Sequence, residues 1–179
     1  MKRMLKKTLA TALIIVMTLC VVACGGGDDD GYISYTSAGL NYEFPDYIQE
    51  IDVNYADYAY ASMDYSIMTR DVEVLMYFYS SDQLISDLAL SRNVTVKDYA
   101  KWFIRQYAGV TMEENYDEEN SIITLKYVYE EGSDSYFFFD YIIRNEYMLY
   151  HITYSCDPEN RALYEADFEE WASRISMIY

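Results

Sequence analysis

Two apolar runs joined by a short polar break decide the fold of this chain: residues 135–155 read SYFFFDYIIRNEYMLYHITYS. Because asparagine tolerates positive φ, Asn145 and Glu146 are predicted to form a two-residue hairpin turn. The numbers of paired residues then add up to 291, so Asp140 faces His151. One face of this hairpin is apolar throughout, which is typical of a face turned toward a core. That face carries Phe137, Phe139, Tyr141, Ile143, Met148, Tyr150, Ile152 and Tyr154.

The opposite face of the hairpin is mixed, as expected where a helix partly covers a sheet; it carries Phe138, Asp140, Ile142, Leu149, His151 and Thr153. Asp140 and His151 can form a structural cross-strand pair that fixes the register of the two strands. Alternatively, a carboxylate that orients an imidazole is half of a hydrolase triad. A hydrolase also needs a hydroxyl about 3 Å from His151 in a concave pocket, and no serine stands in a nucleophile-elbow sequence. We therefore expect a structural pair and no catalytic residue.

Apolar alternation extends the predicted sheet toward the N-terminus. Strands are predicted over residues 40–45, 72–78, 110–116, 121–130, 135–144 and 147–155. The last four follow one another with turn residues between them, which indicates an antiparallel meander. The first two, together with an aromatic stretch over residues 58–68, are predicted to form the first half of the same sheet.

Helix signals interrupt this alternation. Thr95 with an acidic residue three positions later is a capping sequence, and a helix is predicted from there to Gly109 with one apolar stripe: Val96, Tyr99, Phe103 and Tyr107. A shorter helix is predicted over residues 81–90. Asp157 and Pro158 open a last helix, whose buried face is predicted to carry Tyr164, Phe168, Trp171 and Ile175. The predicted fold class is α+β: an antiparallel β-sheet with a C-terminal four-strand meander, flanked by helices as an α/β/α sandwich, in one domain over residues 39–179.

The first 23 residues have the pattern of an export signal. Four basic residues within positions 2–7 precede an uncharged run, residues 8–23, that is too short to span a bilayer. The run ends in Val21-Val22-Ala23-Cys24, which resembles the lipobox of bacterial lipoproteins. The resemblance implies cleavage between Ala23 and Cys24 and acylation of Cys24. The lipid would then hold the mature protein at the outer face of the bacterial cytoplasmic membrane.

The chain is strongly acidic. Its 179 residues include 13 Lys and Arg against 30 Asp and Glu, a formal net charge of -17. Removing residues 1–23 takes away four basic residues and no acidic ones, which leaves 9 against 30 and a net charge of -21. A nucleic-acid partner is excluded, because binding phosphates needs clustered basic side chains. Residues 24–38, rich in Gly and Asp, are predicted to be a flexible tether.

The cysteine count leaves no intramolecular disulfide in the predicted domain, because Cys156 is the only thiol beyond Cys24. An unpaired cysteine in an exported protein is either a buried small apolar residue or a reactive thiol. No basic neighbour in the sequence lowers the pKa of Cys156, so burial is the preferred interpretation. The domain is predicted to be a monomer.

The order of the predicted elements is similar to that of the PsbP-like family. Three segments mark this order: LNYEFP at residues 40–45, TVKDYA at 95–100 and FEEWAS at 168–173. The resemblance covers about residues 35–179. It implies an antiparallel sheet flanked by helices, and a protein that acts by binding other proteins or by stabilising assemblies. It implies no shared catalytic set and no particular ion site.

Little in the sequence points to a cofactor. His151 is the only histidine, which excludes a metal cluster based on histidines, and no glycine-rich phosphate loop is present, so no metal and no cofactor are expected. The acidic segment over residues 113–120 lies where a turn is expected, and is either solvated or a calcium loop.

These observations leave two classes of function open. The first is a membrane-anchored extracytoplasmic lipoprotein that binds or helps to assemble a protein or a cell-envelope component, and that is not an enzyme. The alternative is an extracytoplasmic hydrolase that uses Asp140 and His151. The lack of a complete catalytic constellation favours the first.

Overall fold

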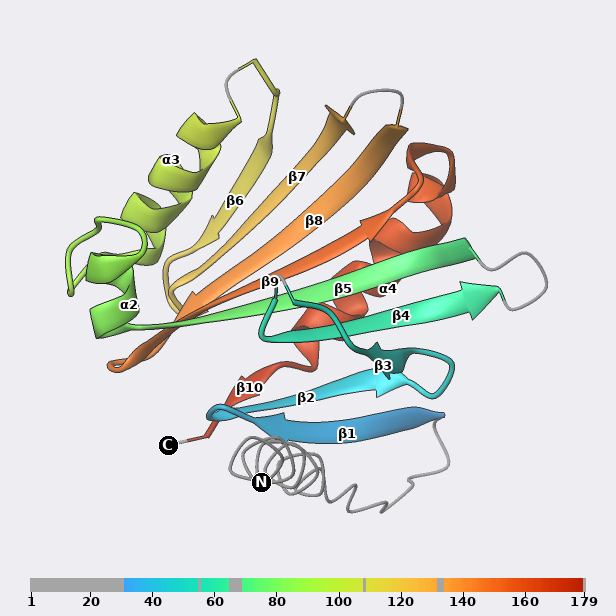
Figure 1. The fold of residues 1–179 in the computed structure, drawn as a ribbon, viewed down its shortest axis with the longest axis horizontal. Helices are drawn as coiled ribbons and strands as arrows, with labels where there is room; N and C mark the ends of the chain where they lie inside the picture. Colours follow the sequence, from blue (N-terminus) through green and yellow to red (C-terminus); the bar gives the residue numbers. More distant parts are fainter. Residues whose placement is uncertain (1–30, 55, 65–68, 108, 132–133, 179) are drawn as a thin grey trace, which may run out of the picture.

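The structure, a computed structural model, describes residues 31–54, 56–64, 69–107, 109–131 and 134–178 (Figure 1). In chain order its strands are β1 (Tyr32–Ser37), β2 (Leu40–Pro45), β3 (Gln49–Ile51), β4 (Tyr58–Asp64), β5 (Thr69–Ser80), β6 (Glu113–Asp117), β7 (Ile122–Glu131), β8 (Asp134–Arg144), β9 (Met148–Cys156) and β10 (Ser176–Met177). Its helices are α2 (Ser81–Ser86), α3 (Val96–Gln106) and α4 (Arg161–Ser173), and a 3-10 turn over Pro158–Asn160 leads into α4.

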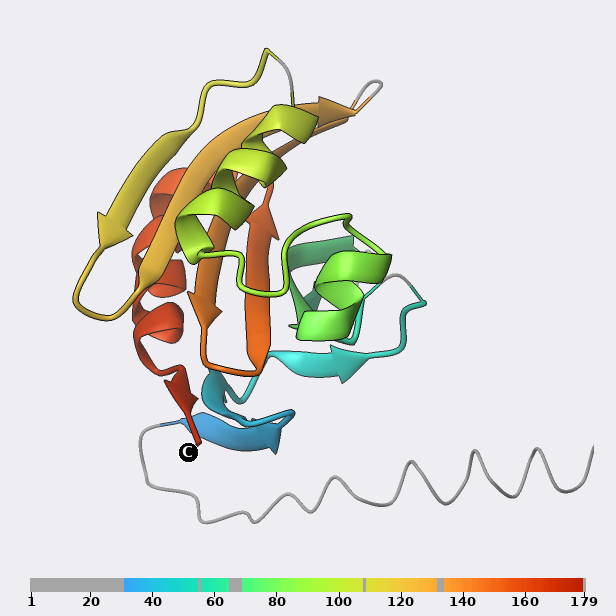
Figure 2. The same ribbon diagram turned by 90° about the vertical axis from the view of Figure 1, so that its left-hand side faces the viewer.

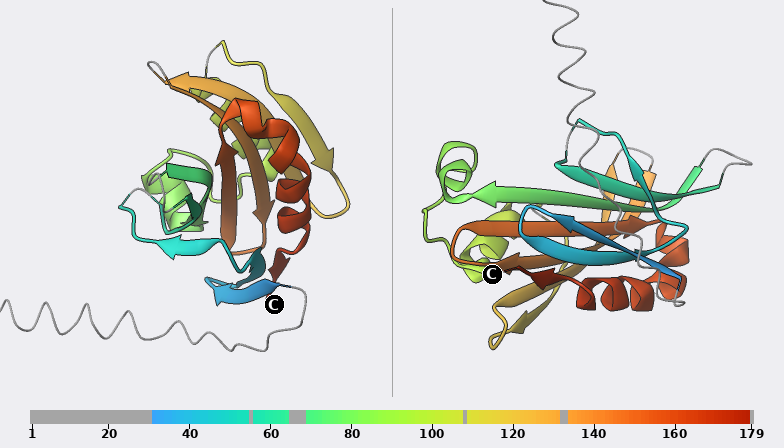
Figure 3. Two further views of the ribbon diagram at one scale, coloured as in Figure 1. Left: turned by 90° about the vertical axis from the view of Figure 1, so that its right-hand side faces the viewer. Right: turned by 90° about the horizontal axis from the view of Figure 1, so that it is seen from below.

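Seven strands form the main sheet, in the order β3-β4-β5-β9-β8-β7-β6, with every neighbouring pair antiparallel. The predicted C-terminal meander is confirmed, because β6, β7, β8 and β9 lie side by side in chain order. Helix α3 covers one face of this sheet and α4 covers the other (Figures 2 and 3). The fold is therefore the α+β sandwich that the sequence predicts.

Strands β1, β2 and β10 form a second, three-stranded sheet. The prediction that residues 40–45 belong to the first half of the main sheet is therefore wrong. Strand β2 instead pairs with β1 across the two-residue turn Ala38–Gly39, and with β10 after α4. Both turn residues have positive φ, 48° at Ala38 and 86° at Gly39, which is the geometry that two-residue hairpins favour.

Strand β1 also corrects the predicted tether, which extended over residues 24–38. Residues 32–37 pair with β2 along the whole strand. Ile33, Ser34 and Thr36 are exposed on this edge strand, so its sequence lacks the apolar alternation that predicts a strand. The predicted signal peptide and Cys24 lie outside the described residues.

The tight turn between β1 and β2 allows a direct test. Gly39→Ala is expected to lower the free energy of unfolding by about 1–2 kcal/mol. Alanine at a φ of 86° is strained, and its Cβ would lie 3.1 Å from the Tyr150 hydroxyl, which donates a hydrogen bond to the Ala38 carbonyl. Urea denaturation measures the loss. Gly109→Ala is the matched control, since φ there is 94° but no atom lies within 4 Å of the added Cβ. Equal losses in the two variants would contradict a role for the Tyr150 contact.

The helices begin close to their predicted caps. The Thr95 hydroxyl accepts a hydrogen bond from the Asp98 backbone N–H at the start of α3. Asp157 accepts from the N–H of Glu159, but the turn that follows is 3-10, and α4 begins only at Arg161. The predicted helix over residues 81–90 is shorter, because α2 ends at Ser86. Among the described residues, no helix has both the length and the apolar character needed to cross a membrane.

Two apolar clusters lie on the two faces of the main sheet. The larger cluster joins the main sheet to β2 and α4, and Trp171, Phe168 and Phe44 are fully buried in it. The predicted apolar face of the β8–β9 hairpin belongs to this cluster and is confirmed. The smaller cluster lies under α3 and includes Tyr99. The mixed face of the hairpin is therefore the face that α3 covers.

The turn between β8 and β9 lies one residue later than predicted. The Asn145 side-chain oxygen accepts hydrogen bonds from two backbone N–H groups that follow it, so Glu146–Tyr147 forms the turn. Asp140 consequently pairs with Thr153, and the predicted direct pairing of Asp140 with His151 is wrong. A shift of two in register leaves every side chain on its predicted face.

Candidate functional site

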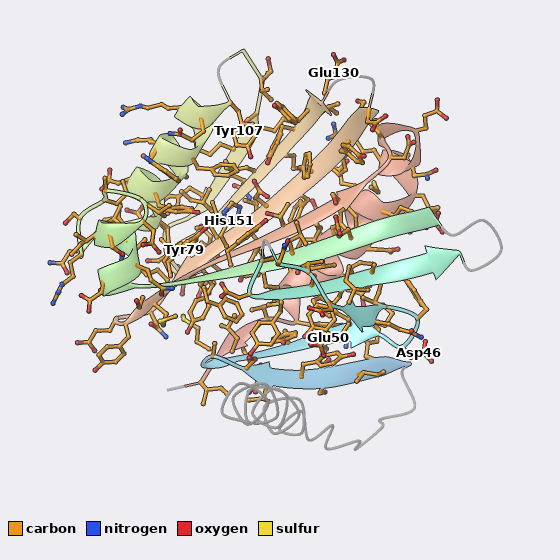
Figure 4. The ribbon with its side chains drawn as sticks, in the orientation of Figure 1. Asp46, Glu50, Tyr79, Tyr107, Glu130 and His151 are labelled. Atoms are coloured by element: carbon orange, nitrogen blue, oxygen red, sulfur yellow. The ribbon has the colours of Figure 1, made fainter. Side chains whose placement is uncertain are left out.

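His151 and Asp140 lie on the face of the main sheet that α3 covers. His151 is 3% exposed on β9, and Asp140 is completely buried on β8. The alternate residues of both strands are fixed in the larger core, so the sheet holds the two side chains toward the helix. Figure 4 shows His151 between α3 and the sheet, near Tyr79 and Tyr107.

Three side chains form a continuous polar chain here. Asp140 Oδ1 lies 3.3 Å from His151 Nε2, and the Tyr99 hydroxyl from α3 lies 3.0 Å from His151 Nδ1. The Thr153 hydroxyl also lies 3.3 Å from Nε2. We assign the tautomer with Nε2–H toward the carboxylate, so that Tyr99 donates its hydrogen to Nδ1. Asp140 and His151 are thus diagonal neighbours in contact, with Tyr99 above them.

No hydrogen bond of good geometry reaches either oxygen of Asp140 in the part of the chain that the structure describes, and its polar neighbours are His151 Nε2 and the phenol of Tyr127. Tyr127 on the neighbouring strand β7 lies close enough for the Asp140 charge to act on it. Burial, followed by that charge, raises the pKa of Tyr127 far above its ordinary value. The carboxylate therefore sits among groups that remain uncharged phenols.

A pocket of about 290 Å³ opens beside this polar chain, between α3 and the sheet. Phe103 packs edge-on against His151, with ring centroids 4.7 Å apart. No lysine or arginine is among the described residues that line the pocket. Its walls are aromatic: Tyr77, Tyr79, Tyr99, Trp102, Phe103, Tyr107, Tyr127 and Phe138. We call it the aromatic pocket.

The aromatic pocket meets the geometric requirement of the hydrolase alternative but not its chemistry. The hydroxyl near His151 belongs to Tyr99, and burial, with Tyr79 and Asp140 nearby, raises the pKa of that phenol far above its ordinary value. A phenol held in this way keeps its proton and does not attack a substrate. The Thr153 hydroxyl approaches the same ring nitrogen as Asp140, so His151 cannot relay a proton between those two groups.

The contact between Tyr99 and His151 was not among the predictions from the sequence. The helical stripe of Val96, Tyr99, Phe103 and Tyr107 was a usable signal, because an apolar stripe needs a sheet face to cover. The mixed face of the predicted hairpin was the face left available for it. That combination would have placed Tyr99 over His151, although 52 residues separate them.

A second hollow, of about 720 Å³, lies beside α4 and the turn between β6 and β7. Its floor is apolar and includes Phe139 and Tyr141 from β8. Its rim carries the carboxylates of Asp117, Glu119 and Glu169. Lys126 binds Glu169 and Glu165, so that part of the rim is locally neutralised. We call this hollow the acidic groove.

The acidic segment over residues 113–120 forms β6 and the turn into β7. Asp117 accepts hydrogen bonds from the backbone N–H groups of Glu119 and Asn120 and from the Asn120 side-chain amide. The Asn120 amide is the main reason why the pKa of Asp117 is lowered. Both oxygens of Asp117 thus accept hydrogen bonds from within the turn. Among the described residues, no three His, Cys, Asp or Glu side chains gather closely enough to hold a metal ion.

Cys156 ends β9 and is buried, as predicted. Burial, with a smaller contribution from Asp157, raises the pKa of its thiol to about 11. The thiolate, which is the reactive form, is therefore disfavoured.

No family model matches the chain, and no curated protein sequence matches it. Solved structures do match its fold. Cyanobacterial PsbP (CyanoP) from Synechocystis sp. PCC 6803 has a TM-score of 0.60 at 17% identity, over 86% of this chain and 96% of that one. The Ran-binding protein Mog1p of Saccharomyces cerevisiae has a TM-score of 0.52 at 7% identity, over 82% and 95%.

A protein from Bacteroides thetaiotaomicron VPI-5482 matches with a TM-score of 0.54 at 9% identity and covers 82% of this chain. This chain spans about half, 48%, of that longer protein. At these identities the likeness concerns the fold. The PsbP-like arrangement of elements that the sequence predicts is the one the chain adopts.

Proposed function

We propose that this protein is a lipoprotein of the outer face of the cytoplasmic membrane, and that it acts as a binding or assembly module rather than as an enzyme. One observation supports a binding role over an enzymatic one. The polar chain from Asp140 through His151 ends at the buried phenol of Tyr99, where an enzyme would need a nucleophile. The name of Mog1p as a Ran-binding protein supports protein binding on this fold. The lipobox resemblance at Cys24 supports the anchor.

The acidic groove is where we place the partner. After removal of residues 1–23 the chain has a net charge of -21, so its surface attracts basic groups. The apolar floor at Phe139 and Tyr141 provides contact area, and the exposed carboxylate of Glu119 on the rim provides charge. A basic segment of a protein or of a cell-envelope component fits this combination. Complementary charge of this kind favours fast and selective association.

Affinity purification from solubilised membranes tests this proposal. The full lipidated chain is compared with Glu119→Lys, which reverses one charge on the groove rim. Glu146→Lys is the matched control, because it makes the same change on the exposed turn between β8 and β9. We expect a defined set of partners with the unchanged chain and the control. Glu119→Lys and high salt should reduce their recovery several-fold.

Two outcomes contradict the proposal. Equal recovery with Glu119→Lys and with the unchanged chain would remove the groove as the docking surface. Substrate turnover that disappears in Asp140→Asn would support the hydrolase in place of the binding module.

A further inference from the structure

Asp140 is a buried carboxyl group that the fold satisfies only in part. It is completely buried, and no hydrogen bond of good geometry reaches either of its oxygens from the described residues, although His151 and the phenol of Tyr127 lie close to it. Its neighbours are His151 Nε2 at 3.3 Å and the phenol of Tyr127, and neither side chain is a permanent cation. Buried carboxylates are normally hydrogen-bonded or paired with a cation, because leaving water is costly for a charge. Among the described residues, no lysine or arginine pairs with Asp140, and a cationic ligand could take that place.

Asp140 does not itself line the aromatic pocket, but its neighbours His151, Thr153 and Tyr127 do. Thr153 pairs with Asp140 across the two strands, and both Thr153 and His151 line the pocket. The carboxylate is therefore one side chain behind the pocket wall. Trp102 and Phe103 from α3 form part of the opposite wall. The faces of aromatic rings carry negative potential and attract cations, most strongly when the site excludes water.

We propose that the aromatic pocket binds a small organic cation of the quaternary-ammonium or alkylammonium class. The rings surround the charged head, and Asp140 supplies the compensating charge from behind Thr153. A volume of about 290 Å³ suits one such head rather than a polymer. A neutral sugar or aromatic compound would leave the charge of Asp140 uncompensated, and an anion would be repelled by it. No lysine or arginine among the described lining residues places its own positive charge in the pocket.

Choline and 3,3-dimethylbutan-1-ol form a suitable pair of probes, because they have the same shape and differ in the positive charge. The full lipidated chain, purified in a maltoside detergent, is titrated with each compound by calorimetry. We expect choline to bind in the millimolar range or more tightly, and the neutral compound to bind at least about tenfold more weakly.

Three variants locate the binding. Asp140→Asn keeps the shape of the side chain and removes its charge, and it should weaken choline binding about tenfold. Trp102→Leu removes one aromatic wall and should weaken it to a similar degree. Tyr147→Leu is the matched control, because Tyr147 is 70% exposed on the β8–β9 turn and should leave the affinity unchanged. Circular dichroism verifies folding. If Asp140→Asn does not fold, Trp102→Leu and the comparison of choline with the neutral compound still test whether the pocket binds a cation.

Dissolved choline and a choline lipid headgroup present the same chemistry, and a change of detergent distinguishes them. A phosphocholine detergent should abolish choline binding if the pocket takes headgroups, and should leave it intact if the pocket takes only the free cation. Equal binding of the two probes, no choline binding in the millimolar range, or full affinity in both pocket variants would overturn the proposal. The inference goes beyond the proposed function, since the acidic groove lies on the α4 side of the sheet and Glu119→Lys does not touch the pocket.

Discussion

Trp171→Ala is expected to lower the free energy of unfolding by about 3–5 kcal/mol, out of a total of about 5–15 kcal/mol for a domain of this kind. Trp171 is 1% exposed on α4. Its ring centroid lies 6.5 Å from that of Phe44 on β2, 6.2 Å from Tyr154 on β9 and 5.6 Å from Phe168 on α4. One side chain thus packs the helix against both sheets, and its removal leaves a cavity that none of the three elements can fill alone.

Urea denaturation monitored by circular dichroism measures this loss. Leu163→Ala is the matched control on the same helix, because Leu163 is 64% exposed and its truncation should change stability by less than about 0.5 kcal/mol. A loss below about 1 kcal/mol for Trp171→Ala would show that the small sheet and α4 do not depend on this contact.

Alternation in the sequence predicts the faces of the β8–β9 hairpin correctly but not its register. Side chains on a strand alternate with a period of two, so two registers that differ by two residues bury the same set. Turn chemistry selects between them. The Asn145 side chain accepts hydrogen bonds from the residues after it, so the turn centres on Glu146–Tyr147 instead of on Asn145 itself. Asp140 and His151 therefore remain on one face and in contact, although they are diagonal rather than opposite.

Two strands that alternation does not predict, β1 and β10, owe their stability to pairing rather than to burial. Strand β1 exposes Ile33, Ser34 and Thr36, and is fixed by backbone hydrogen bonds to β2 and by the turn at Ala38–Gly39. Strand β10 has only two residues. Neither segment is long or alternating enough to be read as a strand. Gly39 itself was the available signal in the sequence, because a glycine between two short β-prone runs is typical of a hairpin turn.

The aromatic pocket could be predicted only in parts. The stripe on α3 and the mixed hairpin face were both visible in the sequence, and each pattern by itself predicts only that the residues are covered. The hydrogen bond from Tyr99 to His151 depends on where α3 crosses the sheet. That crossing is set by the packing of the smaller cluster, including Ile142 and Leu149, and not by any local pattern.

Cys24→Ser is expected to remove the lipid from the protein completely and to release the protein from the membrane. The thiol of Cys24 is the atom that the lipobox resemblance assigns to the lipid, and serine cannot form the thioether. Two acyl chains anchor stably because each buried methylene contributes about 0.8 kcal/mol. Without the lipid, a mature chain with a net charge of -21 is repelled by anionic headgroups and has no other attraction to them. The core elements begin at Tyr32, so the domain should remain folded.

Cys20→Ser is the matched control for this change, because Leu19 before it is too bulky for the position that Ala23 occupies before Cys24. The control variant should keep both the lipid and the membrane association. Membrane fractionation together with the intact mass of the purified protein distinguishes the possibilities, since an uncut signal adds residues 1–23 and a lipid adds its own mass. A Cys24→Ser protein that still carries lipid would overturn the assignment of Cys24. Loss of lipid from Cys20→Ser would show that Cys20, four positions earlier, carries the lipid. The segment between the lipid and β1 would then be four residues longer.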